Sequence, residues 1–166
     1  PVATYTVADG NGGTDTGTLT IAITAVNDSP VADDESATAT EDVLLSVGAG
    51  SGLLVGDTDA DGDTLSVASF TVAGDLTVYA AGSTATIAGV GDLTINADGS
   101  YSFDPAPDYA GPVPVAIYTV SDGNGGSDTG TLAIAITAVN DAPVADDETA
   151  SATEDVLLSV GAAAGL

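Results

Sequence analysis

Alternation of apolar and polar residues is the first pattern in this chain. Over Thr18–Thr24, leucine and isoleucine alternate strictly with threonine and alanine. A period of two with many β-branched residues predicts a half-buried β-strand. The same pattern returns at Leu132, Ile134 and Ile136. We therefore expect a second strand of this kind late in the chain.

Glycine-rich turns join the predicted strands into hairpins. Tyr118–Val120 predicts a strand, and Asp122–Gly126 follows it as a turn before the strand at Leu132. A second hairpin is expected from strands at 93–96 and 100–103, because the Asp-Gly pair at 98–99 supplies the positive φ of a tight turn. Further strand candidates are 35–40, 43–47, 64–72, 76–80 and 84–88, and no segment has the pattern of an amphipathic helix.

So many short, closely spaced strands predict an all-β fold, and we expect a Greek-key β-sandwich of the immunoglobulin-like type. Hydrophobic residues make up 44% of the chain, which is too many for a disordered acidic segment. They are mainly alanine, valine, leucine and isoleucine, with only five tyrosines and two phenylalanines. The core is therefore expected to be thin and built from small aliphatic side chains.

The chain repeats itself with a period of 113 residues. Aligned without gaps, residues 1–53 and 114–166 are identical at 44 of 53 positions. The acidic segments at 26–34 and 139–147 are the expected junctions, because each contains a proline that interrupts a strand. Cutting there predicts the C-terminal strands of one repeat at 1–28, one complete repeat at 29–141 and the N-terminal part of another at 142–166. Neighbouring repeats of a tandem array are expected on both sides.

The net charge of the chain bears most directly on which ligands it can bind. It has 25 Asp and Glu residues and no Lys, Arg or His, for a net charge of −25. No side-chain salt bridge can form, and the like charges oppose compaction. Nucleic acid and anionic membranes are poor partners, because both need basic patches, and no apolar run in this segment is long enough for membrane insertion. Dissolved divalent cations are the simplest counter-charge, and without cysteine they cannot be held by thiolates.

The densest acidic segment is Asp57-Thr58-Asp59-Ala60-Asp61-Gly62-Asp63. Alternate carboxylates on a loop bent at glycine can converge on one point, and Ca²⁺ takes six to eight such oxygen ligands. The segment matches the first half of an EF-hand loop, but Ala68 stands at the twelfth position and cannot ligate. We therefore expect Asp57, Asp59, Asp61 and Asp63 to bind calcium with ligands from elsewhere, the alternative being a solvated acidic turn.

Two further acidic groups recur in both copies of the repeat. One lies at the junctions, where the alternative is a polar linker: Asn27, Asp28, Asp33, Asp34 and Glu35, copied at Asn140, Asp141, Asp146, Asp147 and Glu148. The other, which could equally be a solvated turn, precedes a Val-Leu-Leu segment: Glu41 and Asp42, copied at Glu154 and Asp155.

Five motifs together give the chain a family resemblance. They are VNDAPVADDE, TEDVLL, DTDADGDTLSV, LTINADGSYSFDP and YTVSDGNGG. In this order they resemble the cadherin-like and VCBS-type repeats of giant bacterial surface adhesins of the RTX type, which are exported by type I secretion. The resemblance implies a cadherin-like sandwich with calcium at the domain junctions.

The cadherin linker motif D-x-N-D-x-A-P is matched only in its later part. Asn27-Asp28-Ser29-Pro30 and Asn140-Asp141-Ala142-Pro143 correspond to it, whereas Ala25 and Ala138 replace its first aspartate. The cadherin D-A-D ligand pair corresponds to Asp59 and Asp61, and the glutamate near the end of the first strand corresponds to Glu41. These positions are therefore implied calcium ligands.

The expected direction of the strands also places these acidic residues beside the linkers. A strand that leaves the first junction ends near Glu41 and Asp42, and the next strand returns toward the loop at 57–63. We expect Asp59 and Asp61 to meet the linker residues Asn27 and Asp28. At the far junction, Glu41 and Asp42 are expected to meet Asn140 and Asp141.

These observations predict an extracellular spacer repeat on a bacterial surface, stiffened by calcium, that holds an adhesive region away from the cell. The open alternative is a repeat subunit of a self-assembling, calcium-dependent surface filament, in which like chains pair through unfilled strand edges. An enzyme is not expected, because the acidic residues lie in turns and the chain has no histidine, cysteine or basic residue.

Overall fold

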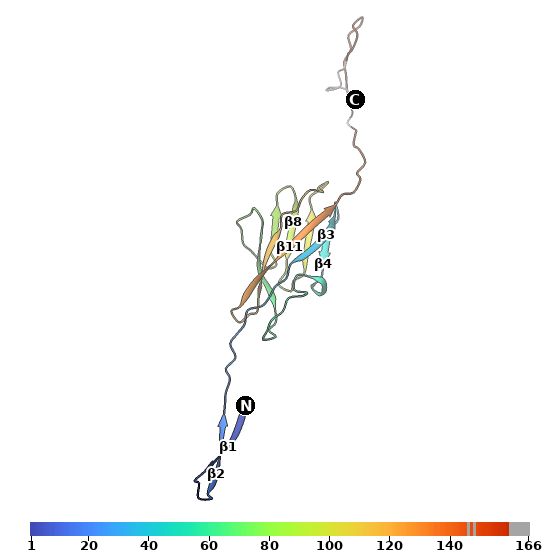
Figure 1. Ribbon diagram of the computed structural model, residues 1–166. Coiled ribbons are helices and arrows are strands. Elements are labelled where there is room, and N and C mark those ends of the chain that lie inside the picture. The colour runs from blue at the N-terminus through green and yellow to red at the C-terminus, as the bar shows by residue number, and fades with distance from the viewer. Residues whose placement is uncertain (146, 148, 160–166) are drawn as a thin grey trace.

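The computed structural model describes residues 1–145, 147 and 149–159 (Figure 1). Part of the predicted second junction, Asp146 and Glu148, lies outside the described residues, as does the end of the predicted 142–166 piece at 160–166. Within the described residues the regular structure is almost entirely β, and one short 3-10 helix, η1, covers Ala49–Ser51.

The strands form a two-stranded hairpin followed by a sandwich of two sheets. The hairpin pairs β1 with β2, the five-stranded sheet has the order β3-β11-β10-β5-β6, and the four-stranded sheet has the order β4-β9-β8-β7. The predicted all-β sandwich is confirmed. The strands are β1 Val2–Ala8, β2 Thr14–Thr20, β3 Glu35–Thr40, β4 Leu45–Val47, β5 Ser66–Val72, β6 Tyr79–Ala80, β7 Thr84–Ile87, β8 Gly91–Ile95, β9 Tyr101–Pro105, β10 Ala116–Ser121 and β11 Ser127–Thr137.

Alternation along the strands fills the space between the two sheets. In β8, Leu93 and Ile95 are buried while the residues between and before them are not, which is the period of two that a half-buried strand requires. Most of the buried hydrophobic residues are aliphatic, as the sequence predicts, but the largest fully buried side chains are aromatic: Tyr118, Phe70 and Phe103.

The pairing of β3 with β11 is parallel, whereas the other strand pairs of the sandwich are antiparallel. Both strands therefore start at the same end of the sandwich and finish at the other. We call the first the entry end, made by residues 27–35, 57–63 and 122–128. The second is the exit end, made by residues 41–42, 106–112 and 137–141. In Figure 1 the chain enters and leaves the sandwich at these opposite ends.

The hairpin of β1 and β2 is the copy of β10 and β11, but it stands apart from the sandwich (Figure 1). Tyr5 is 54% exposed where its copy Tyr118 is fully buried. The predicted strand over Thr18–Thr24 is wrong in its second half, since β2 ends at Thr20. The corresponding half of β11 pairs only with β3, and residues 21–24 lack such a partner.

Tyr118 ties the entry end to the core. Its hydroxyl donates to the carbonyl oxygen of Asp33 at 2.8 Å and lies against Glu35 and the carbonyl oxygen of Leu53. Gly130 of β11 makes room for it: a Cβ there would lie 2.3 Å from both the Asp33 carbonyl oxygen and the Tyr118 hydroxyl.

We therefore predict that Gly130→Ala destabilises the sandwich by about 1–3 kcal/mol, the usual cost of forcing an extra carbon into a packed site. Gly17→Ala is the matched control, because Gly17 is the copy of Gly130 and a Cβ there would meet only the exposed Tyr5 ring. Urea unfolding of both variants measures the difference. Equal stability of the two variants would contradict the role given to Gly130.

Candidate metal centres

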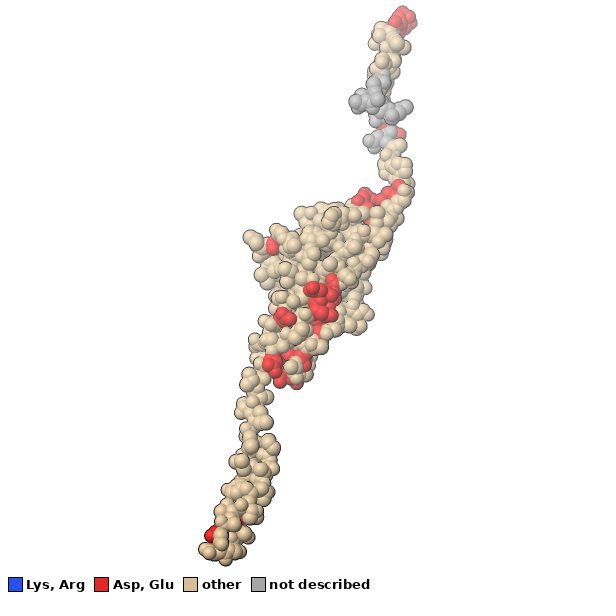
Figure 2. Space-filling model, viewed as in Figure 1, with Lys and Arg blue, Asp and Glu red and all other residues tan. Residues whose placement is uncertain are grey.

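Three groups of acidic side chains each bring carboxylate oxygens within 4.8 Å of one another. The entry cluster contains Asp59, Asp63 and Asp122; the exit cluster contains Asp42, Asp108 and Asp141; the inner cluster contains Asp33, Glu35 and Asp57. Figure 2 shows acidic side chains gathered at the two ends of the sandwich and along the face between them, with no basic residue nearby.

The entry cluster is preorganised by its own backbone. Asp59 Oδ1 accepts hydrogen bonds from the amides of Asp61 at 2.9 Å and Asp63 at 3.1 Å, and Gly62 takes the positive φ of 77° that the bend requires. From the β10–β11 turn, Asp122 is held by the amide of Gly126 at 3.0 Å. Two separate turns therefore aim carboxylates at one point.

The linker that enters the sandwich contacts this cluster directly. Asn27 Nδ2 donates to Asp122 Oδ2 at 2.7 Å, and the amide of Asp28 donates to Asp61 Oδ2 at 2.8 Å. Asn124 Nδ2 likewise donates to Asp63 Oδ2 at 2.7 Å. The bond from Asn27, helped by turn amides, lowers the pKa of Asp122, so this carboxylate is ionised in the folded state.

The exit cluster joins the outgoing linker to the other end of the sandwich. The amide of Val139 donates to Glu41 Oε2 at 2.8 Å, and the amide of Asp108 donates to Asp42 Oδ1 at 3.0 Å. Asp42 and Asp108 have positive φ values of 60° and 57°. Desolvation, and then repulsion by Asp108, Glu41 and Asp42, raises the pKa of Asp141. These like charges are held together without a counter-charge in the described chain.

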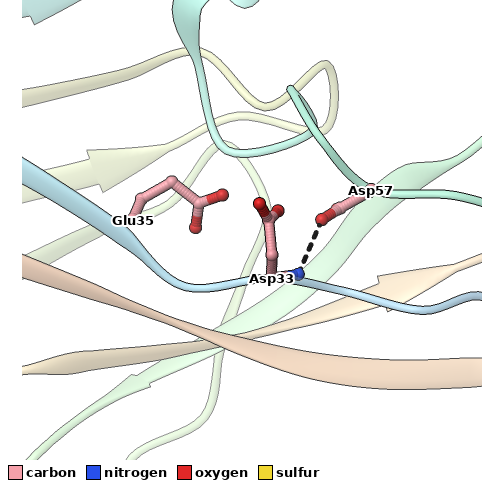
Figure 3. Close-up of side chains that lie close together, drawn as sticks. All are labelled: Asp33, Glu35 and Asp57. Carbon is pink, nitrogen blue, oxygen red and sulfur yellow. Dashed lines mark hydrogen bonds between the residues drawn. The ribbon is translucent and has the colours of Figure 1, made fainter.

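The inner cluster lies behind the entry end, where β3 begins. In Figure 3 the carboxylates of Asp33, Glu35 and Asp57 gather around one space, and the amide of Asp33 donates to Asp57 Oδ1 at 3.0 Å. Burial raises the pKa of Glu35 to about 7, opposed by the Tyr118 hydroxyl and reinforced by the charges of Asp33 and Asp57. Burial and the neighbouring Asp33 also raise the pKa of Asp57 to about 6.

Buried oxygens without partners test whether a cation suits these clusters. Glu35 Oε1, Asp57 Oδ2 and Asp59 Oδ2 are buried and accept no hydrogen bond. An unsatisfied buried carboxylate oxygen is costly, and a hard divalent cation satisfies several of them at once. The donor set is all oxygen, from carboxylates and amides, so these residues fit calcium.

The acidic loop at 57–63 is divided rather than convergent. Asp57 turns to the inner cluster, whereas Asp59 and Asp63 join the entry cluster, and Asp61 meets the linker at Asp28. The loop thus passes between two sets of neighbours, and the role of its four aspartates as calcium ligands stays a prediction.

The linker residues also differ in whether they lie at one of the three clusters. Asp34 lies in none of the clusters, since its Oδ1 accepts bonds from the amide and hydroxyl of Thr131 at 2.9 and 2.8 Å. Asn27 and Asp28 lie at the entry cluster and Asp141 at the exit cluster, while Asn140 Nδ2 donates only to the Asp141 carbonyl oxygen.

Sequence reasoning missed two cluster members, Asp108 and Asp122. The sequence pattern predicts only a turn at Asp122, yet this turn recurs at Asp9–Gly13, where Asp9 Oδ1 accepts hydrogen bonds from the amides of Asn11 and Gly13, both at 2.8 Å. That duplicated Asp-Gly-Asn-Gly-Gly motif was the available signal. Asp108 lies between the two repeated segments, 1–53 and 114–166, so the repeat offers no second copy of it for comparison.

The two-sheet sandwich with acidic clusters at both ends is the architecture of a cadherin-like module. Comparison with protein families agrees: residues 27–138 match the bacterial cadherin-like domain. The chain therefore belongs to the bacterial cadherin-like domain family, a structural and non-enzymatic family. Within the described residues, no helix is long and apolar enough to cross a membrane.

The other comparisons add little. No curated protein matches the chain. A solved structure that matches is that of a nucleoside hydrolase-related hypothetical protein from Saccharophagus degradans that is associated with carbohydrate metabolism. The identity is 22% and the TM-score 0.43, over 68% of this chain and 26% of that one. At this TM-score the likeness carries no argument.

The raised pKa values in the inner cluster predict an unusual pH dependence. Glu35 titrates at about 7 and Asp57 at about 6 in the folded state, against about 4.3 and 3.9 in model peptides. Between the unfolded-state and folded-state pKa values of Glu35 and Asp57, the folded state therefore binds more protons than the unfolded state. In calcium-free buffer, the free energy of unfolding should therefore fall as the pH rises from about 4 to about 7, and then level off.

Urea unfolding at a series of pH values measures this slope. Glu35→Gln should remove the larger part of it. Asp92→Asn, which removes one exposed charge of β8 away from the cluster, should leave the slope in place. A slope that survives in Glu35→Gln would show that general charge repulsion, rather than the inner cluster, sets the pH dependence.

Proposed function

We propose that this chain is a calcium-binding spacer repeat, and that calcium stiffens the joints between successive repeats. The observation that carries the proposal is the contact between each linker and a carboxylate cluster of the sandwich. Asn27 and Asp28 bond to the entry end at 2.7 and 2.8 Å. Asp141 lies in the exit cluster.

In a tandem array, the repeat period would bring the exit cluster of one repeat and the entry cluster of the next to the same joint. Asn27-Asp28 and Asn140-Asp141 are copies of one another, 113 residues apart. In a tandem array the linker aspartate would therefore join the exit cluster of the preceding repeat, as Asp141 does, and the Asn-Asp pair would contact the entry end of the following one, as Asn27 and Asp28 do. Calcium at these clusters ties together three chain segments that otherwise meet only through an extended Pro-containing linker.

Electrostatics supplies the driving force for metal binding. The chain carries a net charge of −25, so each joint without calcium is a point of concentrated repulsion. Extracellular calcium modules bind at about 0.1–1 mM, and a ligand that binds only the folded arrangement stabilises it by mass action. Magnesium should act less well, because it demands tighter octahedral geometry and loses its water reluctantly.

The family and the charge support a proposal for the wider setting of the repeat. We assign residues 29–141 as the complete repeat, 1–28 as the last strands of a preceding repeat and 142–166 as the start of the next. The array would act outside a bacterial cell, on its surface, as part of a large adhesin. In low-calcium cytosol the unneutralised joints would keep the chain loose, which suits export.

The proposal predicts which residues hold the ion. Asp59→Ala or Asp61→Ala should weaken calcium binding at the entry end by at least about tenfold, or about 1.4 kcal/mol, while the sandwich stays folded at saturating calcium. Asp98→Ala is the matched control, because Asp98 lies in the β8–β9 turn, outside the three clusters, and only caps Ser100. Titration calorimetry with calcium measures the affinities.

Two outcomes would contradict the assignment. An unchanged calcium affinity in both loop variants would remove the entry cluster from the metal site. A wild-type melting temperature that is the same in millimolar calcium and in chelator would reject calcium binding altogether.

A further inference from the structure

One side of the sandwich is built from an uncharged segment. The five-stranded sheet ends in β6 and the four-stranded sheet ends in β7, and only residues 81–83 separate these two strands in the chain. Both sheets therefore end on the same side. Residues 76–91, which build it, are the longest run of the chain without a charged residue, and we call them the uncharged edge. The opposite side, made by β3 and β4, has Glu35 at the start of β3 and Glu41 just after its end.

The backbone of β7 is open on one side. It pairs with β8, and no described strand pairs with its other side. The amide of Val90 donates to the Ile87 carbonyl oxygen at 2.9 Å, which directs the backbone groups of Ile87 toward β8. Because successive residues of an antiparallel pair alternate, the backbone groups of Thr84 and Thr86 face the open side. Their side chains are exposed as well, whereas Ala85 is buried in the core.

The uncharged edge lacks the features that keep natural edge strands from pairing. A charged side chain, a proline or a β-bulge usually serves this purpose, but β7 reads Thr-Ala-Thr-Ile in an unbroken register with β8. Beside β6, Leu76 and Val78 are 100% and 67% exposed. Asp75 fixes this loop, because its carboxylate accepts hydrogen bonds from the Thr77 amide at 2.9 Å and the Tyr79 hydroxyl at 2.7 Å. The edge thus presents an open strand together with apolar side chains, which mark interaction sites.

We infer that β7 of one copy of this chain binds β7 of a second copy as an antiparallel strand, so that two four-stranded sheets join edge to edge. Charge selects this partner. Two copies with a net charge of −25 each repel one another, and the uncharged edge is the side that adds no like charge to the contact. A basic partner would instead be attracted to the acidic ends of the sandwich.

The acidic residues of the neighbouring strand are too far away to prevent the contact. Asp92 of β8 lies opposite Thr86. In the joined sheet the two copies of Asp92 are separated by three strand spacings, or about 14 Å. The screening length at physiological ionic strength is about 8 Å, so their mutual repulsion is largely screened.

The two outward residues of β7 define the register. With Ala85 of one copy opposite Ala85 of the other, Thr84 of each copy faces Thr86 of its partner. This register uses every outward backbone group of Thr84 and Thr86, and each facing pair exchanges two hydrogen bonds. Threonine pairs across strands add to the stability. The contact is two-fold symmetric and therefore closes as a dimer.

An array of repeats would make this contact many times. A single four-residue strand gives a weak contact, but effective concentration strengthens each later contact between two arrays. Two-fold symmetry makes the paired arrays run in opposite directions, which suits arrays that extend from two facing surfaces. Only this extension rests on the proposed function, since no residue of the uncharged edge belongs to the three acidic clusters.

Disulfide trapping of the full chain tests the pairing and its register. Chains with Thr84→Cys and chains with Thr86→Cys, mixed equally and oxidised, should give a disulfide-linked dimer that contains one chain of each kind. The Cα atoms of such facing residues lie about 5.5 Å apart, which a disulfide can bridge, and the natural chain contains no cysteine. Non-reducing electrophoresis and mass spectrometry measure the yield and the composition of the dimer.

Each cysteine variant oxidised alone is the matched control. It should give several-fold less dimer, because identical positions of the two copies are then offset by two residues. Equal yields in the mixed and the separate samples would mean chance collisions and would overturn the inference.

A charge placed on the edge tests the same contact without cross-linking. Sedimentation velocity of the wild-type chain in millimolar calcium should show a dimer that grows with concentration, and Thr86→Glu should abolish it. Ser46→Glu should retain the dimer, because Ser46 is exposed on β4, at the other edge of the same sheet. Circular dichroism checks that both variants are folded.

Three results would overturn the inference: a wild-type chain that is monomeric at every concentration, a dimer that persists in Thr86→Glu, or a dimer that is lost in Ser46→Glu. Thr86→Glu should leave the calcium affinity measured by calorimetry unchanged. The edge contact and the proposed calcium sites can therefore fail independently of one another.

Discussion

The absence of any positively charged side chain is the constraint on which this structure depends. Twenty-five carboxylates must be accommodated in a folded chain with no lysine, arginine or histidine. The sandwich keeps most of them out of its hydrophobic core and gathers many of them at its two ends, beside the linkers. Hydrogen bonds from turn amides fix several of these carboxylates, but they neutralise none. In the proposed function an external cation relieves the remaining repulsion, and metal binding would then set the geometry of the joints.

The parallel pairing of β3 with β11 determines which acidic segments lie beside each linker. Because both strands begin at the entry end, the incoming linker, the 57–63 loop and the β10–β11 turn meet at one place. Because both finish at the exit end, Glu41 and Asp42 lie beside the outgoing linker. The chain therefore enters the sandwich at one end and leaves it at the other. In the proposed array, each joint would be lined by acidic residues from the ends of two sandwiches.

Sequence reasoning predicted the fold class, most of the strands and the grouping of linker and loop residues. Those features depend on local patterns: alternation, turn chemistry and strand direction. It could not predict that Asp57 separates from Asp59, or that Asp108 joins Asp42, because these depend on packing between distant segments. The aromatic part of the core was missed for a related reason, since composition reports how many rings exist and not that Tyr118 and Phe103 are fully buried.

The segment at 18–24 shows a further limit of sequence reasoning, because here the sequence predicts more strand than the structure contains. Its pattern predicts a strand throughout, and the identical residues 134–137 form one in the sandwich. Without a β3-type partner, β2 stops at Thr20. The alternation of apolar and polar residues therefore indicates that a segment can form a strand. Whether it does so depends on the presence of a neighbouring strand.

Small-angle X-ray scattering on three consecutive copies of the 113-residue period tests the central claim most directly. In millimolar calcium the particle should be a rigid rod. In chelator it should shorten and its distance distribution should broaden, while circular dichroism still reports the strand content of intact sandwiches. A rod that stays equally long and stiff in chelator would contradict the account, because packing and the linker alone would then set the geometry of the joints.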